Sequence, residues 1–583
     1  MKKYFLIFAA ALVALVACER AEEGNDGGND GGKDNPVVVA DAVTLSSDAV
    51  VSIEGSSTIV PIKFNATTAW TAAASDEFIV LNATSGEAGD VELKATVQSL
   101  PDDTDGRIAT VTITAGEASA VVTIYQGVVF ELSSTWAEFG VEGGTMDFTL
   151  VTNLEYTVTT YDVFDWAPLE FDKTTGAGKI TVAANNGYDA RTAYVKFTIP
   201  AIQDPVFDDD GNDTGETKDH VERVYVAQEG NVKFAWTQDF FWTMFSEGAR
   251  HSVALVGDYF VINAPVDANN STGGLLVFKK DDGSYVKKIT SPVSFTGITN
   301  DDKGNVVLTA GGDYPIDEEF WSLIVDEQTP LTVYFISAAD AAAAIASGSV
   351  PEISPVITYA NEFYGYGLDN VRVTGDVFGN AVIAMVSAAY QEEGTTSEFW
   401  NCRTVAWQVT GGVVSNAPAA SRTVPAYMSI WTPADLVSIH LDTDANGPVF
   451  YMGYDGNYQL WYASSMSADW QDVLDSGSSW IEGYGSMDLI EWNGHKYLGL
   501  VAETYFAWYG WGSLPSYLWI INIDDPTAPE AIAKTPIDLT GTEGSWQYGA
   551  TADLVLAVEG NDLVAYVVDA GVSLYTKVVY PVL

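Results

Sequence analysis

One unit recurs along residues 231–583 and restricts the fold of this region. In each copy a Gly-bearing entry leads into a strand-like run, a tight turn and a second apolar run. Gly and Asn tolerate a positive φ, so turns that contain them close β-hairpins. The turns stand at six places: Gly257-Asp258, Lys303-Gly304-Asn305, Phe378-Gly379-Asn380, Asn446-Gly447, Asn493-Gly494 and Gly560-Asn561.

The spacing of the hairpins predicts the architecture. Successive turns stand about 45 to 75 residues apart, and many hairpins continue into further strand-like runs such as "GLLVFKK" and "RTVAWQV". A hairpin followed by two more strands, repeated at this spacing, is typical of a β-propeller. Six units favour six blades, and seven or eight blades stay open because a divergent unit can lie in 313–365. The segment "SAADAAAAIASG" within that interval predicts a short helix.

Two shorter modules precede this region, at residues 40–127 and 128–230. Each contains a "TSG" or "TTG" turn, a strand, a polar loop ending in Arg, a further strand, and a last strand ending in Gln-x-Gly or Gln-Glu-Gly. Runs such as "ATVTI" alternate apolar and polar residues, the pattern of half-buried strands. A repeat at this spacing predicts tandem copies of one β-sandwich. The whole chain is therefore expected to be all-β.

The modules resemble the BACON family, the Bacteroidetes-associated, carbohydrate-binding, often N-terminal domain. The resemblance rests on the Arg-x-Ala strands that begin at Arg107 and Arg191 and on the terminal Gln126 and Gln228. It implies an immunoglobulin-like sandwich and carbohydrate binding. We interpret Arg107 and Arg191 as structural residues that pair with acidic or carbonyl groups inside the fold, because a recurring Arg in a strand usually supports packing.

The N-terminus resembles a bacterial lipoprotein signal. Lys2 and Lys3 precede an apolar run that is short for a membrane span, and "LVAC" ends it. The resemblance implies cleavage after residue 17 and lipidation of Cys18 (a palmitate-type acyl anchor). Residues 18–39 are an acidic tether rich in Gly, Asn and Asp, similar to the surface-export signal of Bacteroidetes lipoproteins. We expect the outer face of the outer membrane; the alternative is a periplasmic lipoprotein with an acidic spacer.

Charge limits the possible partners. The formal net charge is −53 over 583 residues, which excludes a nucleic-acid partner in practice and disfavours peripheral binding to anionic lipid. Membrane attachment is expected through the lipid anchor only. With Cys18 lipidated, Cys402 is the one thiol left, so neither an intramolecular disulfide nor a thiolate metal cluster is expected.

Aromatic residues supply the candidate ligand-binding site. Residues 231–583 hold 14 of the 17 tryptophans. Trp407, Trp461 and Trp519 lie in strand-like runs and are expected in the core. Other rings lie among Gly and Pro, or just before the first strand of a unit, where a loop is expected. Exposed rings can stack on the apolar faces of sugars. The predicted ligand-binding residues are Trp508, Tyr509, Trp511, Trp431, Trp480 and Trp546; for Trp431, Trp480 and Trp546 the alternative is packing between neighbouring blades.

Metal and catalytic signals are weak. Asp208, Asp210 and Asn212 alternate like calcium ligands, but the Gly stands at the fourth place and the twelfth place lacks Glu. The segment is read as a hairpin tip with calcium as the alternative, and no cofactor is expected. Four aspartates, Asp369, Asp435, Asp488 and Asp553, recur just before first strands, which favours structural hydrogen bonds to turn amides over chemistry. No nucleophile or phosphate-binding motif occurs.

These observations predict a cell-surface lipoprotein that binds a polysaccharide or oligosaccharide without catalysis, beside an outer-membrane glycan transporter complex. One alternative is a propeller glycoside hydrolase or lyase, because sequence spacing does not reveal a carboxylate pair. The other alternative is a protein-interaction scaffold of such a transporter.

Overall fold

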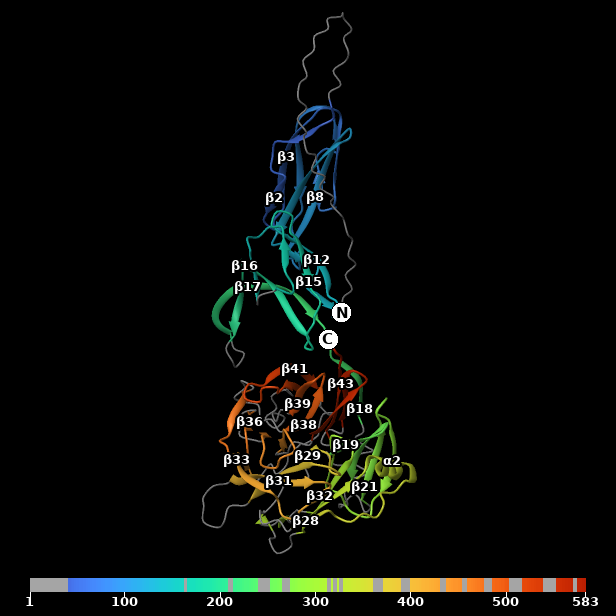
Figure 1. Ribbon diagram of the computed structural model, residues 1–583. Helices are drawn as coiled ribbons and strands as arrows, with labels where there is room; N and C mark the ends of the chain where they lie inside the picture. Colours follow the sequence, from blue (N-terminus) through green and yellow to red (C-terminus); the bar gives the residue numbers. More distant parts are fainter. Residues whose placement is uncertain are drawn as a thin grey trace, which may run out of the picture. The chain divides into compact units, whose positions relative to one another are not determined.

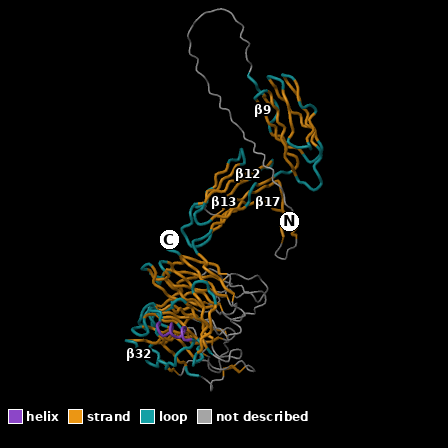
Figure 2. Tube along the Cα trace, turned by 90° about the vertical axis from the view of Figure 1, so that its right-hand side faces the viewer, coloured by secondary structure: helices purple, strands orange, loops and turns teal. Residues whose placement is uncertain are grey.

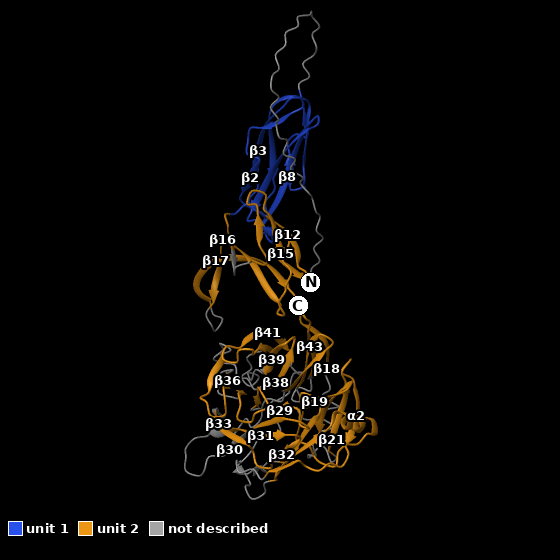
Figure 3. Ribbon diagram, viewed as in Figure 1, with its two compact units in different colours: residues 1–131, 151–154 blue, residues 132–150, 155–583 orange. Residues whose placement is uncertain are grey.

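The computed structural model describes residues 40–161, 165–207, 213–239, 252–264, 273–311, 316–317, 322–323, 329–359, 371–389, 399–429, 437–452, 459–475, 485–502, 516–537, 552–569 and 574–583. The chain divides into two compact units, residues 1–131 with 151–154 and residues 132–150 with 155–583 (Figure 3). Strands dominate both units, and in the described ranges no helix has the length and apolar character needed to cross a membrane (Figure 2).

The first module consists of two sheets that enclose one apolar core. Along the long strands buried and exposed residues alternate, because successive side chains of a strand point to opposite faces. One sheet has the order β1-β3-β7-β5 and the other β2-β9-β8-β4-β6. The strands of the first sheet are β1 (Val43–Leu45), β3 (Thr58–Ala66), β7 (Gly89–Val97) and β5 (Ile79–Leu81). Those of the second are β2 (Val50–Ile53), β9 (Ala118–Gly127), β8 (Gly106–Ala115), β4 (Trp70–Ala74) and β6 (Ser85–Gly86).

The second module has the same plan. Its sheets run β10-β12-β15-β14 and β11-β17-β16-β13. In each module a short strand, β2 or β11, pairs in parallel with the last strand, β9 or β17. The strands β16 and β17 continue past the sheet as a long hairpin (Figure 1). The strands of the first sheet are β10 (Phe130–Leu132), β12 (Gly144–Thr152), β15 (Ala177–Val182) and β14 (Leu169–Phe171). Those of the second are β11 (Trp136–Phe139), β17 (Asp213–Gln228), β16 (Arg191–Phe207) and β13 (Thr157–Tyr161).

Six sheets of four or five strands follow in chain order. We label them A to F. Sheet A contains β19 (Val253–Val256), β20 (Tyr259–Ala264), β21 (Gly274–Lys279) and β22 (Tyr285–Thr290), and sheet B contains β23 (Gly297–Asn300), β24 (Val306–Ala310), β27 (Leu331–Ile336) and β28 (Ile357–Tyr359). Sheet C contains β29 (Arg372–Gly375), β30 (Ala381–Ala389), β31 (Phe399–Thr410), β32 (Val413–Val414) and β33 (Ala420–Ser429), and sheet D contains β34 (Val437–His440), β35 (Val449–Met452), β36 (Gln459–Ala463) and β37 (Gln471–Asp475). Sheet E contains β38 (Gly485–Trp492), β39 (His495–Ala502), β40 (Ser516–Asn522) and β41 (Glu530–Ile537), and sheet F contains β42 (Ala552–Glu559), β43 (Asp562–Asp569), β44 (Leu574–Tyr580) and β18 (Lys233–Asp239). A two-stranded sheet, β25 Ile316–Asp317 with β26 Ser322–Leu323, lies between β24 and β27 in sequence.

The first strands of the six sheets contact one another in sequence order. Contacts run from β19 to β23, β29, β34, β38 and β42, and from β42 back to β19. Sheet F is completed by β18, which comes before sheet A in the chain and pairs with β44 near the C-terminus. A strand from the start of the region thus closes the last sheet.

The predicted hairpin turns are confirmed. Asn493 (φ 54°) and Gly494 (φ 78°) join β38 to β39, and both occupy the left-handed region that Asn and Gly tolerate best. Gly560 (φ 65°) joins β42 to β43 in the same way. Each of these turns connects the first and second strands of its sheet, as the sequence pattern predicted.

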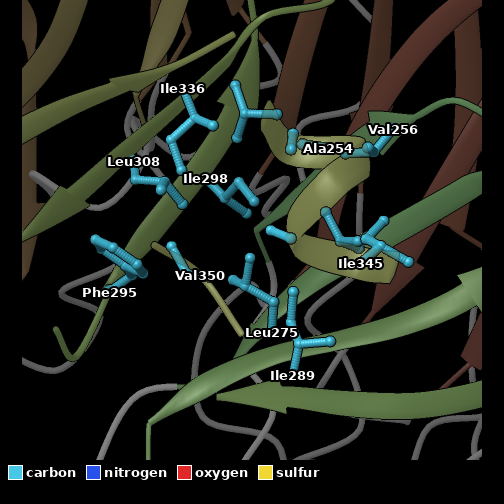
Figure 4. Close-up of a cluster of buried hydrophobic side chains, with 14 of the residues drawn as sticks. Ala254, Val256, Leu275, Ile289, Phe295, Ile298, Leu308, Ile336, Ile345 and Val350 are labelled. Carbon is cyan, nitrogen blue, oxygen red and sulfur yellow. The ribbon is translucent and has the colours of Figure 1, made fainter. Parts of the chain in front are cut away.

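The predicted short helix is also present, as α2 (Ala338–Ser347). Ser337 caps its start by accepting a hydrogen bond from the Asp340 amide, and Gly348 ends it at φ 88°. Figure 4 shows Ile345 of this helix packed with apolar side chains of sheet A, including Leu275 and Ile289. The helix therefore fills part of the core next to sheets A and B and adds no separate layer.

The tryptophans expected in the core lie at different depths. Trp407 is fully buried, whereas Trp461 and Trp519 are half-buried. Trp519 belongs to β40, the third strand of sheet E, where it packs beside a cluster between sheets D and E. The backbone of Cys402 lies in β31, and its side chain is outside the described residues.

Candidate functional site

The predicted site residues lie outside the described residues. This holds for the lipidation residue and the calcium candidates as well as for the aromatic residues. The residues concerned are Cys18, Asp208, Asp210, Asn212, Trp431, Trp480, Trp508, Tyr509, Trp511 and Trp546. In the described ranges no group of three or more His, Cys, Asp or Glu side chains is arranged to hold a metal ion.

A buried ion pair joins the beginnings of four first strands. Asp553 at the start of β42 accepts hydrogen bonds from Arg372 of β29 at 2.5 Å, from the Ser486 hydroxyl of β38 at 2.6 Å and from the backbone N–H of Val253 of β19 at 2.8 Å. Arg372 is 3% exposed and Asp553 1%. Arg372 also donates to the Met487 carbonyl. Four sheets therefore bring the same end of their first strands to one point, which we call the starting end.

The strand register shows which parts of the chain reach the starting end. Neighbouring strands within sheets A to E are antiparallel, so a second strand ends and a third begins where the first begins. In sheet E these borders are Ala502 and Ser516, on either side of the aromatic segment 503–515. In sequence, the segments with Trp431, Trp480 and Trp546 each follow the last strand of one sheet and precede the first strand of the next. Because the last strand runs antiparallel to the third, it also ends at the starting end.

The opposite ends of the first strands surround a cavity of about 690 Å³. All six sheets contribute to its wall. Five carboxylates line it, Asp301, Asp302 and Asp442 from turns and Asp488 and Glu491 from β38. The other lining residues are Leu255, Thr299, Asn300, Lys303, Gly304, Val373, Thr374, Leu441, Thr443, Leu489, Ile490, Lys496, Val555 and Leu556.

Asp488 has a structural role and an unusually high pKa for an aspartate. Its carboxylate accepts from the backbone N–H groups of Leu489 (2.9 Å) and of Leu556 on the first strand of sheet F (2.7 Å). Burial raises the pKa of Asp488 to about 6, against the opposing effects of the Leu556 hydrogen bond and the charge of Arg372. Asp488 and Asp553 confirm the predicted structural hydrogen bonds to backbone amides, with one correction: these amides belong to strands, including a strand of the next sheet, rather than to turns. Asp369 and Asp435 lie outside the described residues.

The raised pKa of Asp488 predicts how the stability of the protein depends on pH. Between the unfolded pKa near 3.8 and the folded pKa near 6, the folded state holds a proton that the unfolded state has released. This group's contribution to the free energy of unfolding therefore falls as pH rises from about 4 to 6, by up to about 3 kcal/mol. Asp488→Asn removes that contribution, so the difference in unfolding free energy between variant and parent should shift in the variant's favour from pH 4 to pH 7. Urea unfolding at both pH values measures it, and an identical difference at both would refute the assignment.

The repeated Arg residues of the two modules are structural, as expected. Arg107 donates from Nε to the Gln126 side chain at 2.8 Å and from Nη2 to the Gln98 and Ser99 carbonyls. Its guanidinium also lies over the Phe78 ring at 3.7 Å. The second module repeats this with Arg191, Gln228, the carbonyls of Ala183 and Ala184, and the Trp166 ring at 4.2 Å.

The histidines do not form a common site within the described residues. His440 is buried in β34, and burial lowers its pKa to about 4. His495 is exposed and contacts Asp524 at 2.5 Å, and His220 lies between Asp204 and Glu222 on the long hairpin. His495 and His220 thus serve separate local contacts, whereas both ring nitrogens of buried His440 lack a hydrogen-bond partner among the described residues.

The buried Arg372–Asp553 pair escaped the sequence analysis. Arg372 lies in "DNVRVTGD", and its partner stands 181 residues later. The available signal was an arginine inside an apolar strand of a chain with only 26 basic residues, a position that requires an acidic partner.

Two protein families match parts of the chain. Residues 68–127 match BACON, described as "Putative binding domain, N-terminal", which agrees with the predicted resemblance of the first module. Residues 342–570 match a family described as "Domain of unknown function (DUF8500)". No curated protein matches the sequence.

Solved structures give only weak similarities. A GH5 xyloglucanase of Bacteroides ovatus is 20% identical over 15% of this chain, with a TM-score of 0.14; the chain spans about a fifth of that enzyme (19%). Tandem titin Ig domains A164-A165 are 8% identical over 32% of this chain and 98% of theirs, with a TM-score of 0.16. An endo-fucoidan hydrolase of glycoside hydrolase family 107 is 12% identical over 34% of this chain and 30% of its own, with a TM-score of 0.14. Scores this low support no argument about fold or function.

Proposed function

We propose that this chain is a cell-surface lipoprotein that binds glycan without catalysis. In the proposed architecture, the signal peptide 1–17 and lipidated Cys18 anchor the protein, and the tether 18–39 leads to two BACON-like sandwiches, 40–127 and 128–230. A six-bladed β-propeller, 231–583, presents the binding face. Support for the propeller comes from the six successive sheets, the contacts that return from β42 to β19, and the completion of sheet F by β18.

The single observation that carries the binding proposal is the convergence of strand starts at Asp553. Arg372, Ser486 and the Val253 amide reach this carboxylate from three other sheets. The segments with the six predicted ligand-binding rings are bordered by strand ends of the same polarity. In the proposal, rings that are distant in sequence share one face of the propeller.

Glycan is the ligand that this chemistry fits best. Pyranose rings have an apolar C–H face that stacks on Trp and Tyr, while their hydroxyls bind amides and carboxylates. Several such contacts on one face strengthen each other through avidity. The match of residues 68–127 to BACON supports the same ligand class. We further propose that the protein acts beside an outer-membrane glycan transporter.

A glycan array tests the function directly. The full chain, labelled on its amine groups, should bind at least one family of polysaccharides or oligosaccharides in a saturable manner. The immobilised glycans should keep their length and composition after long incubation with the protein. Binding to no glycan, together with co-purification of a stable membrane partner, would favour the scaffold function instead.

One observation favours an enzyme as the second candidate. Asp488 lines the 690 Å³ cavity, and its raised pKa near 6 suits a general acid. Both of its carboxylate oxygens already accept backbone N–H groups, which fits a structural role better. Incubation of the chain with array-positive glycans, followed by reducing-end analysis, separates the two: new reducing ends that disappear in Asp488→Asn would establish the enzyme.

A further inference from the structure

The second module carries a row of aromatic side chains across one sheet. Trp136 of β11 lies opposite Tyr225 of β17, and Tyr225 lies opposite Tyr194 of β16. The ring centroids of Trp136 and Tyr225 are 5.7 Å apart, and those of Tyr225 and Tyr194 are 5.4 Å apart. We call these three residues the aromatic row.

The aromatic row lies on the outer face of the sheet. The residues on either side of Tyr225, Val224 and Val226, are fully buried, so Tyr225 points away from the core. Tyr194 stands between buried Ala193 and Val195 in the same way. The side chain of Trp136 is 51% exposed, and both tyrosines are half-buried beside it. The three rings are therefore available from solvent and are not required to fill the core.

The first module shows that the fold does not need this row. Gln126 and Gln228 make the same hydrogen bonds to Arg in the two modules, which fixes the correspondence of their last strands. Three residues before Gln126 stands Thr123, which pairs with Val50 and Thr110. The first module thus has Val, Thr and Thr where the second has Trp, Tyr and Tyr. Since the first module folds on the same plan without them, the plan itself does not require these rings.

Polar groups border the aromatic row on both sides. Glu138 accepts a hydrogen bond from the Trp136 indole N–H at 3.1 Å. On the other side the guanidinium of Arg223 lies 5.4 Å from the centre of the Tyr194 ring, and Lys196 pairs with Arg223 in the strand register. A ligand on the rings would meet an apolar surface flanked by a carboxylate and by cationic donors.

We propose that the aromatic row is a second glycan-binding site, which holds a polysaccharide chain by ring stacking and by hydrogen bonds from its hydroxyls to the flanking groups. Together the three rings offer at most about 450–750 Å², which is less than the roughly 800 Å² that each partner of a stable protein interface buries. A net charge of −53 opposes nucleic acid. A sugar needs only a small, flat platform with polar flanks, and this is what the row provides. The inference rests on the proposed function for the ligand class, and it concerns a different domain.

The test exchanges the three residues of the aromatic row with the residues at the corresponding positions of the first module. In the full chain, Trp136→Val, Tyr225→Thr and Tyr194→Thr together give the second module the residues of the first; β-branched residues suit strands, so the sheet is retained. The reverse variant carries Val50→Trp, Thr123→Tyr and Thr110→Tyr. Affinity gel electrophoresis uses native gels that contain xyloglucan, mixed-linkage β-glucan, galactomannan, arabinoxylan or polygalacturonate. A further variant with Trp508→Ala and Trp511→Ala, alone and combined with the row variant, isolates the two sites.

Loss of the row should lower the association constant at least fivefold for one of these polysaccharides, also in the Trp508/Trp511 background, and the reverse variant should raise it. Unchanged retardation in the row variant and in the reverse variant would overturn the second site, even where the Trp508/Trp511 variant loses binding. Retardation that depends on the row but not on Trp508 and Trp511 would support the second site and contradict the propeller site. The reverse variant decides the matter if the row variant fails to fold.

Discussion

Replacing Arg372 with Met should destabilise the six-sheet region by about 3–5 kcal/mol. The change leaves Asp553, which is 1% exposed, as a charge without its cationic partner. It also removes the donor that reaches the Met487 carbonyl from another sheet. Differential scanning calorimetry of the full chain measures the effect as a lowered transition temperature.

Two further variants make this prediction specific. Adding Asp553→Asn to Arg372→Met should recover part of the loss, with a coupling energy of about 0.5–3 kcal/mol. Lys63→Met removes the exposed pair between Lys63 and Glu92, at 3.8 Å, and should change stability by less than about 1 kcal/mol. An effect of Arg372→Met as small as that of Lys63→Met would show that the pair does not hold the sheets together.

Replacing Trp508 and Trp511 with Ala should weaken glycan binding by between about fivefold and about 150-fold. The figure follows from about 0.5–1.5 kcal/mol per stacked ring, for two rings, with tenfold corresponding to about 1.4 kcal/mol. The melting temperature should stay nearly unchanged, because the proposal assigns both rings to ligand contact and not to the core. Titration calorimetry with an array-positive oligosaccharide measures the affinity.

Trp492 of β38 provides the matched control. It is 5% exposed, and its indole N–H donates to the Asn561 carbonyl at 2.7 Å. Trp492→Ala should cost about 3–5 kcal/mol of stability and leave the affinity of the folded protein unchanged. A Trp508/Trp511 variant that melts early and binds normally would reverse the assignment of these rings to the ligand.

Local chemistry explains which features were predictable. The hairpin turns follow from a few residues that accept a positive φ, as at Asn493 and Gly494, and the helix follows from a run of Ala between Ser337 and Gly348. Arg107 and Arg191 could be assigned to the fold because the same residue recurs at one place in two copies. Each of these signals lies within a short stretch of sequence.

The features that escaped prediction depend on strand pairing over long distances. Arg372 meets Asp553 across 181 residues, and the aromatic row assembles from three strands. The alternation in "RTAYVKF" does indicate that Tyr194 faces outward, but only the strand register brings it beside Tyr225 and Trp136. Sequence can thus indicate which rings are exposed, whereas their grouping requires the sheet.

The most direct test of the central claim is calorimetric titration of the full chain with an oligosaccharide cut from an array-positive glycan, followed by chromatography of the sugar recovered from the cell. We expect saturable heat of binding and a recovered sugar of unchanged length. Absence of any binding heat, or recovery of shortened products, would contradict a protein that captures glycan without cleaving it.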